Sequence, residues 1–430
     1  MAAGVEGRGM LECSSDVYVG RVRNSSAKGI TLDDTSLRYC ASRIPDLWPN
    51  SVSEIQNIRM FRSWAKSWGE ENREAAWAHL VSYATQNGVQ MLMAAPLTCD
   101  EEADAEDWAW TMQLMQRLGP DHIMGLAVGN ELELLASSSP ITCVRKIWDH
   151  GRLWQVFQER VQQIDDMGFT SVPITTVFTA QILYDGYPFA NIPGRVMAQD
   201  FFVNATRKYG KRFVFTFNVY PYFDPNLKLD PESKHECGYA IQKAACWEPH
   251  CLGVDVMVLA RKRIEALTKK KDDRMWIGEV GWSAPAAISL RPDMQACTEF
   301  SSVKTLQRFY KGFTQWDMTL TDVEGPEHIF YFTLRNSLNF GIQEYFGLMF
   351  TCEATECKLK SENFTEFEAL APPIAVEWLQ LGFGLIAGSV ACMTLLVALF
   401  VCARRKPPAR RGSKSLTANS YGESDDEAAG

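Results

Sequence analysis

Eight short apolar segments alternate with longer stretches of helical periodicity, and this alternation constrains the fold more than any other feature. The expected strands are Val17–Val22, Asn57–Phe61, Gln90–Pro96, Ile123–Asn130, Val172–Phe178, Arg212–Phe223, Met275–Val280 and His328–Leu334. The expected helices are Asn72–Gln86, Asp104–Leu118, Trp154–Met167, Val196–Tyr209, Val254–Lys270 and Phe300–Trp316. Eight such repeats over about 320 residues predict an α/β fold, a closed (β/α)8 TIM barrel. An open doubly wound sheet is the alternative, but the first expected strand is followed by no glycine-rich phosphate loop.

A longer apolar stretch near the C-terminus, Leu381–Cys402, contains 22 residues without a charge, which is long enough to cross a bilayer. Basic residues follow at Arg404, which predicts a cytosolic C-terminus. The expected organisation is an N-terminal segment (1–16), the barrel (17–350), a cysteine-containing linker (351–378), a transmembrane helix (379–403) and a disordered tail (404–430). Gly384 and Gly388 have the spacing that lets two such helices pack closely, which predicts at most a weak homodimer.

Ten cysteines precede the apolar stretch, and N-x-[ST] sequons begin at Asn24, Asn204 and Asn363. Together they predict disulfides, glycosylation and an extracellular or lumenal domain. The segment 1–20 has no apolar stretch typical of a secretory signal, so this location rests on the cysteines and sequons. A net charge of −9 argues against nucleic acid as a partner.

The loop Asp224–Gly253 contains Cys237, Cys246 and Cys251 together with two histidines. A zinc cluster is one interpretation, but no CxxC or HxxxH spacing is present. Disulfides are the favoured interpretation, and neither a metal nor a cofactor is expected.

Two of the expected strands each deliver one glutamate at or near their C-terminal ends: Glu131 after the fourth and Glu279 in the seventh. A parallel barrel presents its chemistry at the C-terminal ends of its strands, so these side chains are expected to meet across its mouth. Paired carboxylates that flank one bond are the equipment of glycoside hydrolysis. Either glutamate alone would be read as a solvated residue that starts a loop.

Three motifs carry a family resemblance: Val128-Gly-Asn-Glu131, Asn218-Val-Tyr-Pro-Tyr-Phe223 and Gly278-Glu-Val-Gly-Trp-Ser283. In this order, on these strands, they resemble glycoside hydrolase family 17, the β-1,3-glucanases and glucan-remodelling enzymes, which are (β/α)8 barrels. The resemblance implies a retaining enzyme that acts on β-1,3-glucan polysaccharide.

The same resemblance implies the roles of individual residues. Glu131 would be the general acid/base and Glu279 the nucleophile. Asn130 would bind the sugar 2-hydroxyl, while Tyr220 and Arg59 would hold the nucleophile. Tyr222 and Trp282 would offer apolar faces to sugar rings, with barrel packing as the other interpretation.

The sequence departs from the family at the eighth strand, where Ser337 stands in place of an auxiliary acidic residue. This departure leaves the preference between hydrolysis and transfer open. It also leaves room for an alternative, a catalytically weak carbohydrate-binding surface protein on the same barrel.

Overall fold

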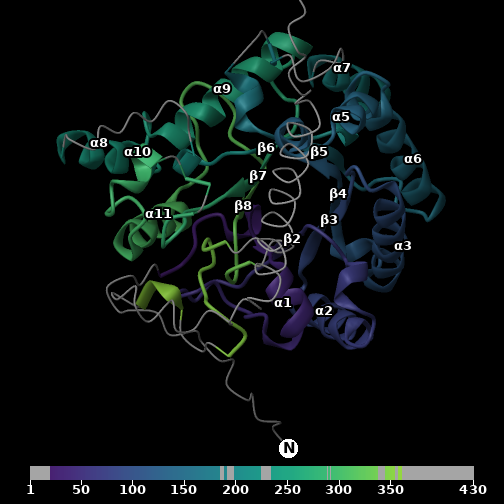
Figure 1. Ribbon diagram of the computed structural model, residues 1–430, viewed down its shortest axis with the longest axis horizontal. Coiled ribbons are helices and arrows are strands. Elements are labelled where there is room, and N and C mark those ends of the chain that lie inside the picture. Colours follow the sequence, from purple (N-terminus) through teal and green to yellow (C-terminus); the bar gives the residue numbers. More distant parts are fainter. Residues whose placement is uncertain are drawn as a thin grey trace, which may run out of the picture. The chain divides into compact units, whose positions relative to one another are not determined.

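Eight parallel strands close into a barrel in the computed structural model, and helices surround it (Figure 1). The structure describes residues 20–360, apart from 185–187, 191–197, 224–233, 288, 291, 338–343 and 354–356. The strands are β1 (Lys28–Leu32), β2 (Asn57–Met60), β3 (Gln90–Ala95), β4 (Ile123–Asn130), β5 (Ile174–Thr179), β6 (Phe215–Asn218), β7 (Met275–Val280) and β8 (His328–Tyr331). Each strand pairs with the next along the chain, and β8 pairs with β1. The expected TIM barrel is therefore confirmed.

The helices follow the strands in the order that a (β/α)8 barrel requires. They are α1 (Asp34–Tyr39), α2 (Arg73–Asn87), α3 (Glu101–Leu118), α4 (Leu135–Ser138), α5 (Ile141–Trp148), α6 (Arg152–Asp166), α7 (Ala198–Tyr209), α8 (Lys234–Ala244), α9 (Leu252–Thr268), α10 (Pro292–Gln295) and α11 (Val303–Gln315). Local signals set their ends: α3 begins after Asp100, whose carboxylate accepts a hydrogen bond from the Ala103 N–H. It ends before Gly119, which has a positive φ of 75°.

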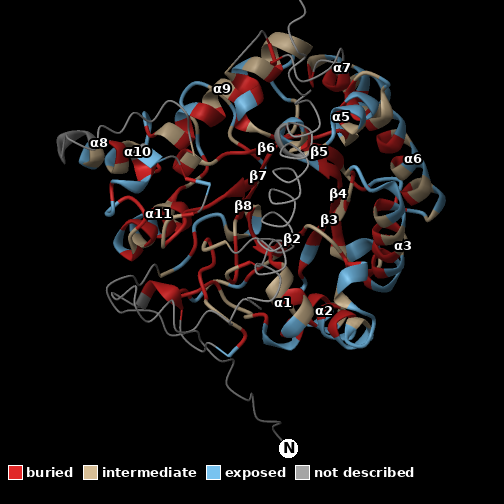
Figure 2. Ribbon diagram, viewed as in Figure 1, coloured by how far each residue is buried: buried red, intermediate tan, exposed pale blue. Residues whose placement is uncertain are grey.

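The strands are buried on both faces, while the helices expose their outer sides (Figure 2). Inside the barrel, the rings of Trp276 and Phe330 fill the space between the strands. Glycines opposite them make this packing feasible, because a Cβ at Gly29 would lie 2.5 Å from the Phe330 ring and one at Gly125 would lie 2.9 Å from Trp276. The interior below the mouth is therefore a packed core.

The predicted first strand, Val17–Val22, is wrong. Gly20 forms only an isolated bridge with Ser51, and the first barrel strand is β1, Lys28–Leu32. The strand β1 was not recognised from the sequence, because a lysine and a glycine interrupt its apolar pattern. Lys28 donates to the Trp316 carbonyl oxygen at 2.6 Å, and burial lowers the pKa of its ammonium to about 7.

The predicted sixth strand, Arg212–Phe223, is too long. The strand β6 ends at Asn218, and Pro221–Phe223 forms a short 3₁₀ turn. The loop after it also contains the helix α8, which the sequence reading missed.

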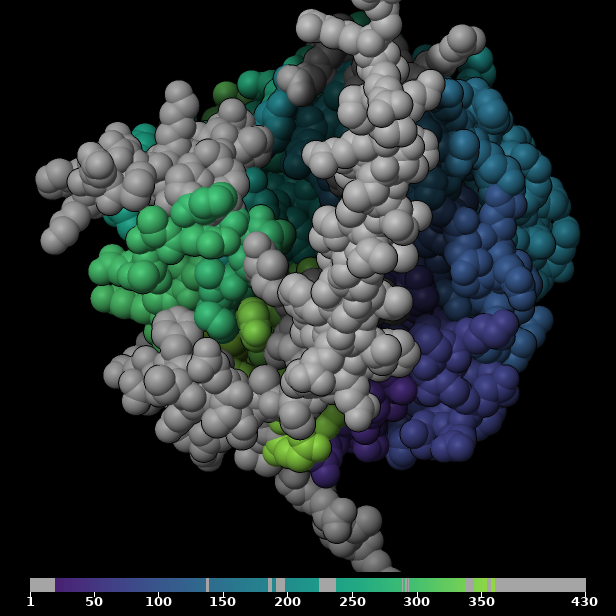
Figure 3. Space-filling model, viewed as in Figure 1, coloured from purple at the N-terminus to yellow at the C-terminus, as the bar shows by residue number. Residues whose placement is uncertain are grey.

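Most of the described disulfides join segments that are distant in sequence, and Cys246–Cys251 closes a short loop. The bonds are Cys40–Cys352, Cys99–Cys143, Cys237–Cys297 and Cys246–Cys251, and Cys357 is also disulfide-bonded. Cys40–Cys352 links the N-terminal part of the barrel to its last described segment, and these lie side by side as purple and yellow-green surfaces in Figure 3. The expectation of disulfides is confirmed, and Cys237, Cys246 and Cys251 are not available to a metal.

In the part of the chain that the structure describes, no helix has both the length and the apolar character needed to cross a membrane. The predicted span Leu381–Cys402, with Gly384 and Gly388, lies outside the described residues, as does the sequon at Asn363. The sequon asparagines Asn24 and Asn204 are both exposed. Their glycosylation stays a prediction.

Candidate active site

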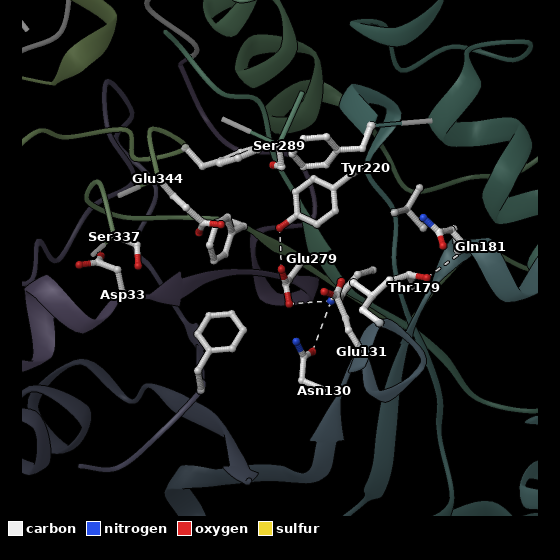
Figure 4. A pocket seen from close by; sticks show the side chains of 18 of the residues that line it. Asp33, Asn130, Glu131, Thr179, Gln181, Tyr220, Glu279, Ser289, Ser337 and Glu344 are labelled. Carbon is white, nitrogen blue, oxygen red and sulfur yellow. Dashed lines mark hydrogen bonds between the residues drawn. The ribbon is translucent and has the colours of Figure 1, made fainter. Parts of the chain in front are cut away.

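A cavity of about 700 Å³ opens at the C-terminal ends of the strands. Its floor contains Glu131, Glu279, Asn130, Asn218 and Tyr220, which come from β4, β6 and β7 or directly follow these strands. Figure 4 shows the two glutamates near the centre, with Asp33, Ser337 and Glu344 on one side and Thr179 and Gln181 on the other. The strands thus bring together the two carboxylates that the sequence separates.

Glu279 is held by donors on both of its oxygens. Arg59 Nη1 donates to Oε1 at 2.8 Å, and the Tyr220 hydroxyl donates to Oε2 at 2.6 Å. Burial raises the pKa of Tyr220 well above its ordinary value, so its hydroxyl stays protonated and can donate. A buried guanidinium and a phenol hydroxyl together stabilise a negative charge on Glu279.

Asn218 joins the two glutamates. Its Nδ2 donates to Glu131 Oε1 and to Glu279 Oε1, each at 2.7 Å. The two oxygens are therefore no farther apart than twice that distance. Asn218 and Glu279 are also register partners on β6 and β7, which places their side chains in one layer of the barrel.

Glu131 lies directly after β4, where its positive φ of 49° turns the chain. Such a conformation is uncommon for a residue other than glycine and is concentrated at functional sites. Burial, followed by the negative charge of Glu279, raises the pKa of Glu131 to about 8. The hydrogen bond from Asn218 opposes this rise. Glu131 is therefore mostly protonated at neutral pH, and among the described residues no cation forms an ion pair with it as Arg59 does with Glu279.

Asn130 is oriented by Arg59, because Arg59 Nη2 donates to Asn130 Oδ1 at 2.7 Å. With this oxygen engaged, the amide nitrogen of Asn130 is the group that can donate to a bound molecule. Arg59 Nη1 also donates to Asn218 Oδ1 at 3.1 Å. One guanidinium therefore positions three side chains of the site.

Gly278 provides the space for this arrangement. A Cβ at this position would lie 2.7 Å from both Arg59 Nη1 and Asn218 Oδ1. Any larger residue would force these two groups away from Glu279. The glycine of the Gly278-Glu motif thus has a steric role in the site.

The structure does not bring Tyr222 and Trp282 to the cavity. Both side chains are fully buried, with an exposed fraction of 0%. The Tyr222 hydroxyl is 2.7 Å from Ser301 Oγ, and Trp282 Nε1 donates to the Phe300 carbonyl oxygen at 2.7 Å. The expectation that they face sugar rings is therefore corrected in favour of packing.

Other side chains of the site were not singled out from the sequence. Asn218 belongs to one of the family motifs, but the sequence analysis assigns it no role in the site. Its position at the end of an apolar run is the signal that could have indicated one. Glu133 is buried near Glu131, accepts a hydrogen bond from the Thr179 N–H, and its Oε2 has no hydrogen-bond partner among the described residues. On the opposite side, Ser337 Oγ donates to Asp34 Oδ1 at 2.9 Å, so a carboxylate from α1 lies beside the altered position.

Comparisons with known proteins yield similar structures but no family. No protein-family model matches the chain, and no curated protein sequence matches it significantly. One of two plant β-glucan endohydrolases with distinct substrate specificities is similar over 69% of this chain and 88% of its own, at 14% identity and a TM-score of 0.42. A family 1 β-glucosidase from Thermotoga maritima is similar over 81% of this chain and 98% of its own, at 10% identity and a TM-score of 0.43.

A β-glucosidase from Exiguobacterium marinum is similar over 77% of this chain and 95% of its own, at 11% identity and a TM-score of 0.37. At such identities and TM-scores, the fold rests on the strand pairing described above. Function has to be argued from the geometry of the site.

Proposed function

We propose that this protein is a retaining glycoside hydrolase in which Glu279 is the nucleophile and Glu131 is the general acid/base. The observation that carries the proposal is the single amide nitrogen of Asn218, which is 2.7 Å from a carboxylate oxygen of each glutamate. The two oxygens are therefore separated by at most twice this distance, which is shorter than the ~6.5–9.5 Å between the carboxyl groups of inverting enzymes and compatible with the roughly 5–5.5 Å of retaining ones.

The two glutamates have the different environments that a retaining reaction needs. Arg59 and Tyr220 favour an ionised Glu279, which can attack an anomeric carbon. Burial favours a protonated Glu131, which can give its proton to the glycosidic oxygen. Paired carboxyl groups in contrasting environments are the usual way to divide the acid and nucleophile roles.

The reaction proceeds in two displacements. Glu279 forms an ester bond to the anomeric carbon as the bond to the leaving group breaks, and Glu131 transfers its proton to the departing oxygen. Glu131, now ionised, then takes a proton from a water molecule, whose oxygen attacks the anomeric carbon and releases Glu279. A sugar hydroxyl in place of that water would give a transfer product.

The substrate is proposed to be β-1,3-glucan, on the basis of the family 17 motifs alone. Asn130 suits this role, because its oriented amide can donate to the sugar 2-hydroxyl beside the nucleophile. The proposal places the barrel outside the cell or in a secretory lumen, anchored by the apolar segment near Leu381. If so, the full chain should resist extraction by carbonate, and its appearance in the soluble fraction would count against the anchor.

Two substitutions test the chemistry on laminarin-type glucan. Glu279→Gln should abolish turnover, because an amide does not form the ester. Glu131→Gln should be slow, and azide should partly restore its turnover of substrates with good leaving groups, with a product that keeps its anomeric configuration. Glu327→Gln, at an ion pair with Arg274 outside the cavity, is the matched control and should behave as wild type.

An inverted azide product, or wild-type rates in either cavity variant, would contradict the assignment. If wild-type protein binds glucan but does not cleave or transfer it, the protein is the carbohydrate-binding alternative. Reducing ends and longer transfer products should be followed in the same assay, since they separate hydrolysis from transfer.

A further inference from the structure

Lys358 is a fully buried lysine that does not line the cavity. Its Nζ donates to Asn336 Oδ1 at 3.0 Å and to the Tyr345 carbonyl oxygen. Burial lowers the pKa of this side chain well below its ordinary value, which favours the neutral amine. A neutral amine has two N–H groups, and these two acceptors engage both of them. Lys358 therefore acts as a hydrogen-bond donor to two fixed partners.

The two acceptors flank a pair of residues that line the cavity. Ser337 follows Asn336, Glu344 precedes Tyr345, and both Ser337 and Glu344 belong to the cavity lining. The Glu344 N–H donates to the Ser337 carbonyl oxygen at 2.9 Å, in an antiparallel bridge. Figure 4 shows these two side chains on the same side of Glu279. One buried amine thus holds both neighbours of this pair.

Lys358 is itself anchored by contacts outside the cavity. Its backbone N–H donates to the Leu348 carbonyl oxygen at 2.7 Å. Gln307, on the outer helix α11, donates through Nε2 to the carbonyl oxygen of Leu359, which is fully buried. A side chain positions others well when its own place is fixed by packing and hydrogen bonds. The amine of Lys358 therefore has a rigid support.

From these contacts we infer that Lys358 is a positioning residue, whose amine fixes Ser337 and Glu344 where they bind hydroxyl groups of the sugar. The inference rests on the proposed glycosidase function and adds to it a residue that acts on the substrate through others. Hydroxyl and carboxylate side chains are partners that sugar hydroxyls need when they leave water. Glu279 and Glu131 are held separately, by donors on β2 and β6. Loss of the amine should therefore weaken binding more than it slows the chemistry.

Lys358→Met tests the inference, because it keeps an apolar chain of similar length and removes the amine. On laminarin-type glucan, KM should rise about 10-fold and kcat should stay within about 3-fold of wild type, since contacts made equally before and during the reaction act on KM. In a Ser337→Ala/Glu344→Gln background, the same substitution should raise KM by less than about 2-fold, because the groups that it positions are already absent.

Lys28→Met is the matched control. Lys28 is also fully buried and donates to two carbonyl oxygens, those of Thr314 and Trp316. It does not line the cavity, and it begins β1, whereas the cavity opens at the C-terminal ends of the strands. Lys28→Met should lower the free energy of unfolding, as Lys358→Met does, and leave KM unchanged. An equal rise in KM in both variants would mean that any loosening of the barrel weakens binding, and it would overturn the inference.

Binding of a laminarin oligosaccharide to Glu279→Gln, with and without Lys358→Met, should be measured by calorimetry. Binding that is about 10-fold weaker with Lys358→Met, without any turnover by wild type, would support the role of Lys358 and refute the glycosidase proposal. Turnover of glucan with a wild-type KM in Lys358→Met would overturn the inference and leave the glycosidase proposal intact. A wild type that neither binds nor cleaves the glucan would refute both.

Asn336→Ala provides a second variant in case Lys358→Met does not fold. It removes one of the two hydrogen bonds from the acceptor side and leaves the lysine in place. It should also raise KM with little change in kcat, and an unchanged KM in Asn336→Ala would overturn the inference.

Discussion

Arg59 and Glu279 form a buried ion pair, with 2.8 Å between Nη1 and Oε1 and side chains that are only 2% and 7% exposed. Taking two charges out of water is unfavourable, and a pair of this kind adds little net stability by itself. Removing one partner is strongly destabilising, because the remaining charge is left buried without a partner. The pair therefore makes the site depend on one arginine at the end of β2.

Arg59→Met should lower both activity and stability. The loss of the cation leaves Glu279 buried without its strongest donor and frees Asn130 and Asn218 to reorient, so kcat should fall sharply. The free energy of unfolding should fall by about 3–5 kcal/mol, the usual cost of breaking a buried pair. Arg274→Met, which breaks a partly exposed pair with Glu327, should cost only about 0–1 kcal/mol. Chemical denaturation measures both, and equal losses in the two variants would contradict the prediction.

Asn218→Ala should change the pH dependence as well as the rate. Glu279 loses a charge-assisted hydrogen bond, which should reduce kcat by about 10- to 100-fold. The Asn218 hydrogen bond holds the pKa of Glu131 down, so its removal should raise that pKa. Because activity needs a protonated Glu131 and is lost above its pKa, the alkaline limb of the kcat/KM profile should move to higher pH. A limb that stays in place or moves down would show that Asn218 does not act on Glu131.

Glu133→Gln should move the same limb in the opposite direction. The charge of Glu133 raises the pKa of Glu131, and the amide keeps an oxygen for the Thr179 N–H. Burial raises the pKa of Glu133 itself to about 7, so Glu133 is mainly ionised in the range near pH 8 where Glu131 titrates. Removing that charge should lower the pKa of Glu131 by a fraction of a unit and shift the alkaline limb to lower pH. Glu159→Gln, on the exposed side of α6, should leave the profile unchanged.

The sequence predicts the barrel well because buried strands are apolar runs and seven of the expected runs overlap real strands. The prediction fails at β1, where two residues that packing requires interrupt the apolar run. Gly29 is required by the Phe330 ring, and Lys28 donates to the carbonyl oxygens of Thr314 and Trp316 at the end of α11. Neither requirement is visible until the partner, about 300 residues away, is in place.

The pair of glutamates was predictable because each lies at or near the C-terminal end of an apolar run, and these runs must end at the same edge of the barrel. The orientation of Tyr222 and Trp282 was not predictable. Both residues come after their strands end, where the alternation of side chains no longer indicates which of them faces the cavity. The Trp282 and Phe300 ring centroids are 4.7 Å apart, and no sequence pattern indicates that this segment packs behind the site. Asn218 was missed although it lies within its strand. Its role depends on two carboxylates that approach it from other parts of the chain, and the local sequence does not reveal them.

His328, the first residue of β8, should make the barrel sensitive to acid. Burial lowers the pKa of its imidazole from 6.5 to about 4, although nearby Glu327 acts in the other direction. The folded state thus binds fewer protons than the unfolded state between these two values. The contribution of His328 to stability is complete above pH 6.5 and is lost as the pH falls toward 4, by up to about 1.4 kcal/mol per pH unit.

His328→Asn should remove this dependence. Several buried carboxyl groups act in the opposite sense, because burial raises the pKa of Asp33 to about 6, so the informative quantity is the difference between variant and wild type. The free energy of unfolding, measured by chemical denaturation across this pH range, should fall less steeply for His328→Asn than for wild type. His79→Asn, at an exposed position on α2, should follow wild type throughout. Parallel curves for wild type and His328→Asn would mean that His328 takes up its proton in the folded state as readily as in the unfolded chain, and that its packing against Trp276 at 5.1 Å does not keep it neutral.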